Sequence, residues 1–283
     1  MYLGRIAPTP TGLLHLGHAR TFAQAAAFAR AANGKLVLRI EDLDAARCKP
    51  HFTTCAIEDL KWLGIDWQEG PDCGGPHAPY IQSQRVTWFN EVWKMLQASG
   101  TIYPCDKSRQ DVERALVAPH AEDEDESIFP TILRPDNHTG KEATSPGNSN
   151  WRFRVPDGEN IYFDDSIQGP QSFTAGKDFG DFLIWRKDGM PSYEMAVVAD
   201  DHAMDITHVV RGADLLKSTA RQILLYRALN WTIPQWSHVP LINDANGQRL
   251  SKRAAGLSIQ ELKNKGLTPA EVLTAPVVSL IGK

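Results

Sequence analysis

The sequence lacks the features that mark membrane, secreted and metal-rich proteins. No apolar run approaches the roughly 18 to 20 residues that a membrane-spanning helix needs. The amino terminus, MYLGRIAPTP, has neither the basic nor the apolar region of a secretory signal. The four cysteines form no CxxC pair and show no zinc-type spacing with histidines. We therefore expect a soluble, cytoplasmic protein with unpaired thiols and no membrane contact.

A strongly basic charge is also missing. The chain has 30 lysines and arginines against 34 aspartates and glutamates, a formal net charge of −4. This balance argues against binding nucleic acid through the overall electrostatic field, although it leaves a local basic groove open. With 283 residues the chain is long enough to bury a sizeable core and long for one compact unit. We expect a monomer whose main domain carries an insertion.

The amino-terminal part reads as strand, helix and strand. Residues 2–7 are short and partly apolar, an alanine-rich stretch over 16–32 has helical character, and Gly34 ends it. A buried strand is expected over 35–40. Strand, helix and strand in so short a span favour a right-handed crossover and a parallel sheet. The pattern predicts an α/β nucleotide-binding architecture.

Periodicity and composition divide the rest of the chain. We expect helices over 52–63, 84–98 and 216–229, and strands over 151–155, 161–164, 192–199 and 207–211. The proline, glycine and asparagine content in the middle of the chain indicates an inserted α+β subdomain. The predicted organisation is an α/β domain in two halves, residues 1–99 and 190–235, with an inserted subdomain, residues 100–189. A short C-terminal helical segment with a basic loop follows over residues 236–283.

His15, Leu16, Gly17 and His18 stand between the first predicted strand and the first predicted helix. Backbone N–H groups at a helix amino terminus attract phosphate, and glycine lets a nucleotide approach the backbone. Imidazoles can donate hydrogen bonds to a pentavalent phosphate. The motif predicts a cradle for the α-phosphate of ATP. Alone it is weak, because two histidines near a glycine also occur by chance.

A second motif, RLSKR, occupies residues 249–253 just after a glycine turn. A loop with lysine and arginine can close on a triphosphate and neutralise the charge that builds as pyrophosphate leaves. We expect this loop to contact ATP, although alone it is as easily explained as a basic surface loop. The two motifs together are far more specific than either alone.

Five polar residues suit a small substrate with more than one charge. They stand at the ends of predicted strands or inside one: Arg5, Glu41, Asp42, Tyr193 and Arg211. The ends of parallel strands converge on the ligand crevice of an open α/β sheet. Two arginines suit two carboxylates, and an acidic residue suits an ammonium group. Each residue alone is better explained as a member of a surface ion pair.

Most of these residues lie in stretches that resemble a known family, and Tyr193 lies just before one of them. RIAPTPTGLLHLGHART, LRIEDLD, LKWLGIDW, QSQR, MAVVADDHAMDITHVVRGADLLKSTARQILLY and RLSKR are together similar to the glutamyl and glutaminyl branch of class I aminoacyl-tRNA synthetases. The resemblance runs from about residue 3 to 256. HLGH corresponds to the family's HIGH signature and RLSKR to its KMSKS loop. The resemblance implies that the two α/β halves predicted above form a Rossmann-type class I catalytic domain.

The resemblance implies a role for each matching residue. It implies glutamate contacts from Arg5, Ala7, Thr9, Glu41, Tyr193 and Arg211. It implies ATP contacts from His15, Gly17, His18, Leu250, Ser251 and Lys252, with His15, His18 and Lys252 catalytic and Mg²⁺ accompanying the ATP. The charge argument agrees, since glutamate offers two carboxylates and one ammonium group.

The chain length and one sequence motif indicate which branch of the family the chain resembles. The chain ends soon after RLSKR, so we expect no helical domain that reads the anticodon, and VRGADL has alanine between glycine and aspartate. Both features resemble the short paralogues, which activate glutamate without tRNA and attach it to the queuosine base in the anticodon of tRNA(Asp). The resemblance therefore implies tRNA as a partner, with tRNA(Asp) that carries queuosine as the expected acceptor.

One departure concerns zinc. The short paralogues commonly bind zinc in the insertion through a Cys-x-Cys pair, a tyrosine and a third cysteine. Here Cys105 is followed two residues later by Lys107, and Phe129 and Leu133 stand where other ligands would fall. One thiolate cannot make a four-coordinate structural site. We predict no zinc and no other bound metal, and expect packing to stabilise the insertion.

Three alternatives stay open at this point. A truncated or discriminating glutamyl-tRNA synthetase that charges the 3′ end of a tRNA has the same active site and differs only in its acceptor. A small-molecule adenylyltransferase uses a similar phosphate motif but has no need of a glutamate pocket. A non-catalytic RNA-binding or regulatory paralogue belongs to another class, and the two intact ATP motifs count against it.

Overall fold

The core of the protein is a six-stranded sheet in the order β2-β1-β8-β9-β5-β6. The computed structural model describes residues 1–107, 128–137, 139–242, 258–275 and 280. In the sheet, β1 pairs in parallel with both β2 and β8, β9 pairs in parallel with β8 and β5, and only β5 and β6 are antiparallel. The strands span Leu3–Ile6 (β1), Lys35–Leu38 (β2), Asn160–Asp165 (β5), Gly169–Thr174 (β6), His208–Gly212 (β8) and Gln235–Val239 (β9). The predicted parallel α/β sheet is confirmed.

The amino-terminal unit forms as its sequence predicts. Helix α1 spans Leu16–Ala31 and is rich in alanine, the residue that loses least on entering a helix. Asn33 then takes a left-handed φ of 48°. A side chain at Gly34 would meet the backbone oxygen of Tyr2 at 2.5 Å, so only glycine lets the chain turn back here to start β2.

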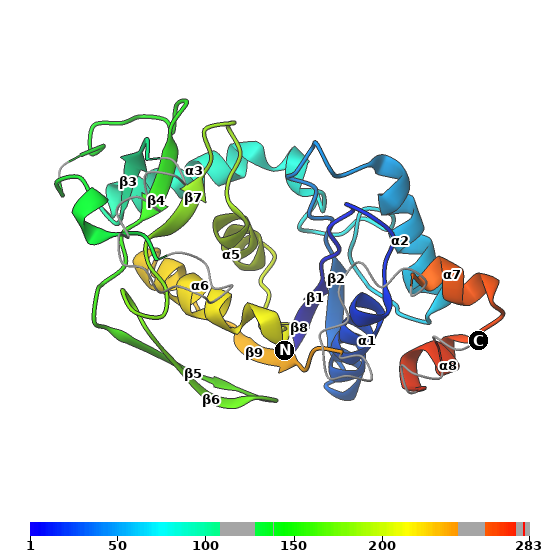
Figure 1. Ribbon diagram of the computed structural model, residues 1–283. Coiled ribbons are helices and arrows are strands. Elements are labelled where there is room, and N and C mark those ends of the chain that lie inside the picture. The colour runs from blue at the N-terminus through cyan, green and yellow to red at the C-terminus, as the bar shows by residue number, and fades with distance from the viewer. Residues whose placement is uncertain (108–127, 138, 243–257, 276–279, 281–283) are drawn as a thin grey trace.

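The remaining helices pack around this sheet and beyond it (Figure 1). They span Pro50–Trp62 (α2), Val86–Ala98 (α3), Tyr193–Ala203 (α5), Leu216–Ala228 (α6), Ile259–Asn264 (α7) and Pro269–Thr274 (α8), with short 3₁₀ turns at Gln82–Gln84, Thr131–Leu133 and Ala213–Leu215. In the part of the chain that the structure describes, no helix is long and apolar enough to cross a membrane.

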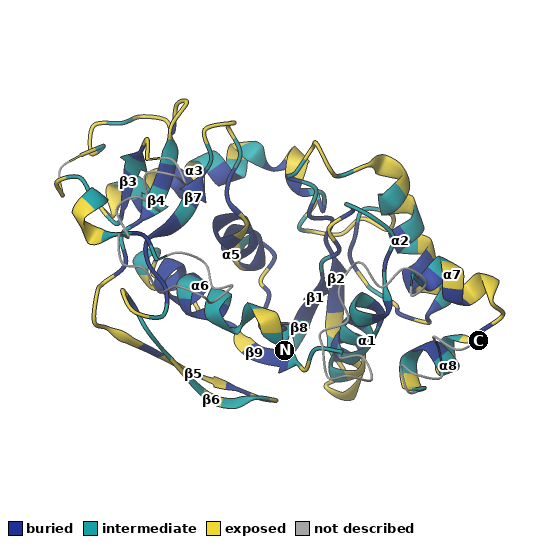
Figure 2. Ribbon diagram, viewed as in Figure 1, coloured by how far each residue is buried: buried dark blue, intermediate teal, exposed yellow. Residues whose placement is uncertain are grey.

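The segment over 192–199 is a helix, so the predicted strand is wrong. Ser192 caps α5 by accepting a hydrogen bond from the Met195 backbone N–H at 3.3 Å. Eight residues of the helix, Glu194 to Asp201, are buried in succession, and α5 is dark over most of its length in Figure 2. A helix surrounded by protein has no polar face, so its sequence reads like a buried strand.

A second, antiparallel sheet of three strands lies at one end of the molecule, in the order β3-β4-β7 (Figure 1). Its strands span Ile102–Cys105, Asn150–Phe153 and Phe182–Trp185. The hairpin β5–β6 lies in the same predicted insertion, yet it joins the main sheet through Asp165, which pairs with Trp236 of β9. The division into domains remains a prediction.

The C-terminal helices pack on the amino-terminal half. Ile259, Leu262 and Val272 of α7 and α8 are buried in one apolar cluster with Leu16 and Leu60 of α1 and α2. Arg20 of α1 also donates to the backbone oxygens of Val272 and Ala275. The chain after the RLSKR motif thereby returns to the helix that follows the HLGH motif.

Candidate active site

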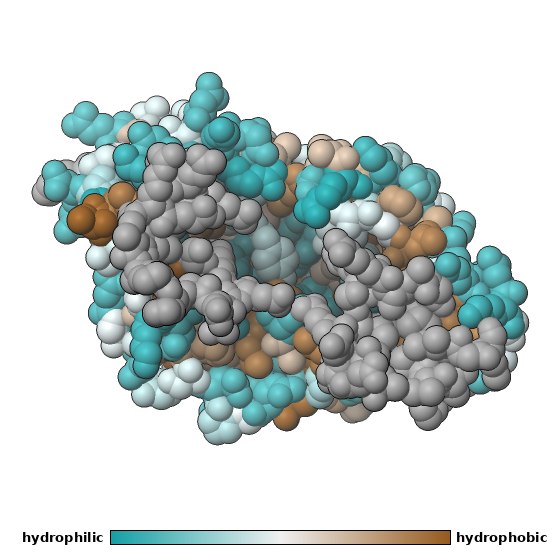
Figure 3. All heavy atoms as spheres, viewed as in Figure 1, coloured by the Kyte–Doolittle hydropathy of each residue, from teal (hydrophilic) through white to brown (hydrophobic). Residues whose placement is uncertain are grey.

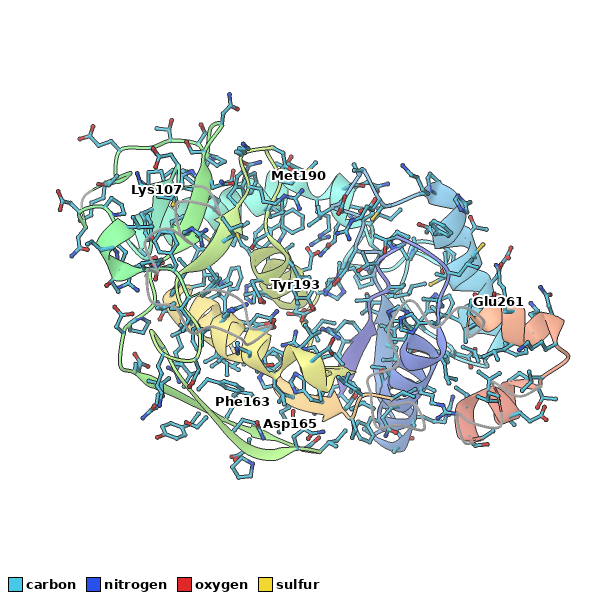
Figure 4. The ribbon with its side chains drawn as sticks, in the orientation of Figure 1. Lys107, Phe163, Asp165, Met190, Tyr193 and Glu261 are labelled. Carbon is cyan, nitrogen blue, oxygen red and sulfur yellow. The ribbon has the colours of Figure 1, made fainter. Side chains whose placement is uncertain are left out.

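A cavity of about 720 Å³ opens where the parallel strands end. Its walls come from the ends of β1, β2, β8 and β9 and from the starts of α1 and α5. The lining residues are Arg5, Ala7, Thr9, His15, Gly17, His18, Thr21, Phe22, Glu41, Tyr193, Val210, Arg211, Gly212, Asp214, Leu215, Pro240, Leu241 and Ile242. β1 lies between β2 and β8, so this is the point where the strand order reverses, the usual ligand site of open α/β sheets. In Figure 3 the surface is hollowed near its middle, where Figure 4 labels Tyr193.

Except for Asp42, the predicted site residues that the structure describes line this one cavity. They are Arg5, Ala7, Thr9, His15, Gly17, His18, Glu41, Tyr193 and Arg211. The predicted ATP contacts Leu250, Ser251 and Lys252 lie outside the described residues. Asp42 does not line the cavity: it accepts hydrogen bonds from the backbone N–H and hydroxyl of Ser83 at 2.8 and 2.7 Å.

The HLGH motif forms the amino-terminal turn of α1. His15 is the N-cap residue, and its ring stacks on that of His18 with 3.7 Å between centroids. A side chain at Gly17 would lie 3.2 Å from two atoms of the His15 ring, so glycine makes room for the imidazole. The helix amino terminus and the two rings therefore face the cavity together, an arrangement suited to phosphate.

The described residues on either side of the RLSKR segment lie beside the same motif. Leu241 and Ile242, which precede the segment, line the cavity. Ser258, which follows it, pairs with His15, and the Ile259 backbone N–H donates to the Leu14 oxygen at 2.8 Å. The described residues that flank positions 243–257 on both sides thus lie close to the HLGH motif.

The deep wall of the cavity rests on buried ion pairs that sequence reasoning did not single out. Arg39 is completely buried and contacts Asp201 at 2.6 Å, Glu41 at 3.0 Å and Asp200 at 3.9 Å. Burial alone lowers the pKa of the Arg39 guanidinium, but the three carboxylates outweigh it and raise that pKa. The cluster holds its charges in place because each one has an opposite partner.

Arg5 and Glu41 belong to the same network and also reach the cavity. Arg5 Nε lies 3.3 Å from both Asp201 carboxylate oxygens, and its Nη1 donates to the Val210 oxygen at 3.3 Å. Burial raises the pKa of Glu41, against the opposing charge of Arg39. A cationic group in the cavity would favour the ionised form of Glu41, so this end of the site suits an ammonium group.

Asp200 extends the network to the QSQR stretch. It accepts from Arg85 Nε at 2.7 Å and from the Gln82 amide at 2.9 Å. The sequence feature that could have indicated this network is the acidic pair in AVVADD, at the end of an apolar run. Charged residues inside an apolar segment need partners to be buried, so their position pointed to an ion-pair network.

Arg211 approaches the cavity from β8. Its Nε lies 3.1 Å from His238 Nε2, and its Nη2 donates to the Thr219 hydroxyl at 2.7 Å. Its Nη1 is buried and has no hydrogen-bond partner among the described residues. An oxygen atom of a ligand would satisfy that donor, which otherwise costs free energy.

Tyr193 is the first residue of α5, not a residue inside a strand as predicted. The Ser192 cap begins the helix and leaves the Tyr193 residue 42% exposed among otherwise buried neighbours. Figure 4 places it in the open middle of the view, beside the start of α5. The prediction that Tyr193 reaches the ligand crevice therefore agrees with its position, although the element is different.

Cys105 lies in apolar surroundings, at the place considered above for zinc. It is buried in a small cluster with Tyr103 and Phe129, against which Leu133 packs. Phe129 and Leu133 carry no donor atoms, so this residue set does not fit zinc. Across the described ranges, no group of three or more His, Cys, Asp or Glu side chains is arranged to hold a metal ion.

Comparison with known proteins identifies relatives of the whole described fold. Residues 3–282 match the family model of class I tRNA synthetases (E and Q), catalytic domain. The glutamyl-Q tRNA(Asp) synthetase of Symbiobacterium thermophilum is 46% identical over 276 residues, which cover 96% of this chain and 84% of the relative. The protein of that name from Nitratidesulfovibrio vulgaris is 43% identical and is matched over 100% of this chain and 87% of its own length.

A solved structure has the same fold. A glutamate tRNA ligase from Elizabethkingia meningosepticum, determined in complex with its amino acid, matches with a TM-score of 0.74 and 33% identity. The match covers 89% of this chain and 52% of that protein, so the chain spans about half of its length.

Proposed function

Because the chain belongs to the family of class I glutamyl- and glutaminyl-tRNA synthetases, which are ATP-dependent ligases, we propose that it activates glutamate with ATP and transfers it to tRNA. The proposed acceptor is the queuosine base in the anticodon of tRNA(Asp), and activation needs no tRNA. The two relatives named glutamyl-Q tRNA(Asp) synthetase, matched over most of their length, support this acceptor.

One observation carries the proposal. A single cavity brings together two arginines, one buried glutamate and the amino-terminal turn of α1 with its paired histidines. Glutamate presents two carboxylates and one ammonium group, and ATP presents a triphosphate. The arginines Arg5 and Arg211 match the carboxylates, Glu41 matches the ammonium group, and the α1 turn matches the α-phosphate. Ala7, Thr9 and Tyr193 complete the amino-acid side of the cavity.

Activation joins the two substrates without a side-chain nucleophile. An oxygen of the glutamate α-carboxylate attacks the α-phosphorus of ATP, a new O–P bond forms, and the bond to pyrophosphate breaks. Catalysis then comes from positioning and from stabilising the charge that develops. We assign that stabilisation to His15, His18 and the backbone at Gly17, with Lys252 and its neighbours Leu250 and Ser251 on the leaving pyrophosphate. Mg²⁺ arrives on the ATP phosphates, as part of the substrate.

Transfer completes the reaction. A hydroxyl of the RNA attacks the carbonyl carbon of the enzyme-bound glutamyl-adenylate, and AMP leaves as the acyl–phosphate bond breaks. The hydroxyl proton is lost as the ester forms. We further propose that the insertion holds no zinc, because the Cys105 cluster offers one thiolate among apolar side chains. Its stability then rests on packing.

The test is ATP–pyrophosphate exchange by the full chain without tRNA. Exchange that depends on glutamate, and not on glutamine or aspartate, is the expected result. Exchange that needs no amino acid, or that another amino acid supports better, contradicts the glutamate pocket. Failure to bind ATP would instead favour a non-catalytic RNA-binding protein.

A further inference from the structure

We propose that His238 and Asp165 are positioning residues that hold Arg211 against the substrate carboxylate. Neither residue lines the cavity, and both side chains are completely buried. They form a chain of contacts from the turn between β5 and β6, through β9, to Arg211 in β8. This inference rests on the proposed function, since it assigns a role in glutamate binding.

The tautomer of His238 follows from the groups around its ring. Arg211 Nε and the Thr219 hydroxyl lie 3.1 and 3.0 Å from Nε2, and Asp165 Oδ2 lies 2.6 Å from Nδ1. Arg211 Nε is only a donor, so Nε2 must accept. The proton then sits on Nδ1, which donates to Asp165 Oδ2. His238 is therefore neutral, with its acceptor side toward the arginine. A protonated ring would turn an N–H toward another N–H and disrupt the contact.

Asp165 is fixed where the hairpin meets the main sheet. Its Oδ1 accepts from the backbone N–H groups of Ile167, Gln168 and His238 at 3.1, 2.8 and 3.1 Å. Figure 4 labels Asp165 at this end of the hairpin, close to β9. The carboxylate thus holds the turn with one oxygen and orients the histidine ring with the other.

The arrangement leaves one edge of the guanidinium for a ligand. His238 takes Nε and Thr219 takes Nη2, while Trp236 packs against the flat face of Arg211 with 4.9 Å between Cζ and the ring centroid. Nη1 has no partner among the residues that the structure describes. Arg211 is therefore held on three sides and keeps a donor for a carboxylate oxygen. Such preorganisation reduces the ordering cost of binding.

The charge balance supports a role beyond packing. Burial and the nearby Arg211 charge keep His238 neutral by lowering its pKa to about 4. Hydrogen bonds from His238 and from the backbone overcome the effect of burial and lower the pKa of Asp165. Asp165 thus orients the neutral ring of His238, and the acceptor side of that ring orients the cationic Arg211.

Two amide substitutions separate the contacts that His238 makes through Nε2 from the contact that it makes through Nδ1 with Asp165. In His238→Gln the amide oxygen reaches the position of Nε2 and can still accept from Arg211. In His238→Asn the shorter amide reaches only the position of Nδ1, so the link to Asp165 survives and the arginine loses its acceptor. We expect His238→Asn to raise the KM for glutamate roughly tenfold or more, as for a lost hydrogen bond to a charged group, and His238→Gln to raise it less than about threefold. The KM for ATP should change little in either variant.

A double-mutant cycle shows whether His238 acts through Arg211. In the Arg211→Ala background, His238→Asn should add no further increase to the glutamate KM. His208→Asn, in the neighbouring strand β8 but outside the cavity lining, is the matched control and should leave the glutamate KM unchanged.

The assay is glutamate-dependent ATP–pyrophosphate exchange, with the unfolding temperature of each variant measured alongside. Equal losses for glutamate and ATP that follow the unfolding temperature would overturn the positioning role, as would an unchanged glutamate KM in His238→Asn. If the wild-type protein shows no glutamate-dependent ATP–pyrophosphate exchange, the proposed function fails. The contact of His238 with Arg211, which we call the clamp, is then tested without substrates. Nitrogen-15 NMR of labelled histidines then reports the tautomer: a proton on Nδ1 of His238 supports the clamp, and a proton on Nε2 overturns it.

Discussion

The two ends of the cavity are built in different ways. At the proposed phosphate end, the cavity lining comes from consecutive residues of one motif at the start of α1, and the groups that face the cavity are the helix amino terminus and two stacked rings. At the amino-acid end, Arg5, Glu41 and Arg211 come from distant segments and each is held by buried partners. A local motif can make a phosphate cradle, whereas recognition of a small charged substrate needs a network.

The difference shows which part of the cavity would determine specificity for the amino acid. A triphosphate can be bound by the backbone N–H groups and side chains at one helix amino terminus, which a single local motif supplies. A pocket for two carboxylates and an ammonium group needs fixed charges at fixed distances, so the protein buries Arg39, Asp200 and Asp201 behind it. Substitutions behind the amino-acid end should therefore affect stability and glutamate binding, and substitutions at the phosphate end should affect the rate. The following predictions test this contrast in order of expected size.

Arg39→Met tests the buried network. It removes the cation that faces Asp201, Glu41 and Asp200, and uncompensated buried carboxylates should lower the free energy of unfolding by about 3–5 kcal/mol. Urea unfolding of the full chain measures the loss. The exposed Arg30 of α1 provides a control, since Arg30→Met should change stability by less than about 0.5 kcal/mol. Similar small changes in both variants would mean that the network does not support the site.

Lys252→Ala tests the phosphate end. Loss of a cation that stabilises the leaving pyrophosphate should slow exchange by roughly 100- to 1,000-fold, the usual cost of removing one transition-state contact. The KM for glutamate should stay close to that of the wild-type protein, because the amino-acid end is untouched. Unchanged exchange would remove Lys252 from the reaction.

The pH dependence of stability tests the buried histidine. The pKa of His238 is lowered from 6.5 to about 4 in the folded protein, chiefly by burial. Between these values the unfolded chain binds the proton and the folded protein does not, so the free energy of unfolding falls as the pH falls from 6.5 to about 4. The contribution is on the order of 3 kcal/mol. In His238→Gln this part of the slope should disappear, and an unchanged slope would show that His238 titrates normally.

Arg211→Ala tests the carboxylate contact itself. Loss of a charge-assisted hydrogen bond should raise the KM for glutamate roughly 10- to 100-fold, with the KM for ATP nearly constant. Arg227 of α6 is an exposed arginine that pairs with Glu159 outside the cavity, so Arg227→Ala is the matched control. Equal effects on both substrates would reject Arg211 as a specific clamp.

Gly17→Ala tests the geometry of the α1 turn. The added carbon would lie 3.2 Å from the His15 ring and displace the imidazole by a few tenths of an ångström. We expect a loss of roughly tenfold in the exchange rate, since small misplacements of a catalytic group are costly. Stability should change little. A normal rate would mean that the position of His15 is not critical.

Helices and strands with a clear local pattern could be predicted from the sequence. The strand, helix and strand of the amino-terminal unit appear at the expected places, and helix α6 begins at Leu216 as expected. Helix α5 was mistaken for a strand because burial on all sides removes the periodicity that separates the two. Local patterns therefore fail where an element is surrounded by protein.

The candidate site also contains residues that local motifs indicate and residues that only the folded structure brings together. Residues that belong to motifs, such as His15, Glu41 and Arg211, were found from the sequence and lie together. Asp165 and His238 were missed because their contact joins residues 73 positions apart, and nothing in either local sequence indicates the other. The long-range partners of a motif become visible only when the chain is folded.

The central claim is best tested by transfer of labelled glutamate, with ATP, to three RNAs: tRNA(Asp) that carries queuosine, the same tRNA without it, and tRNA(Glu). The account predicts labelling of the queuosine-containing tRNA(Asp) alone. Labelling of tRNA(Glu) would contradict it and would make the protein a compact enzyme that charges the 3′ end of a tRNA.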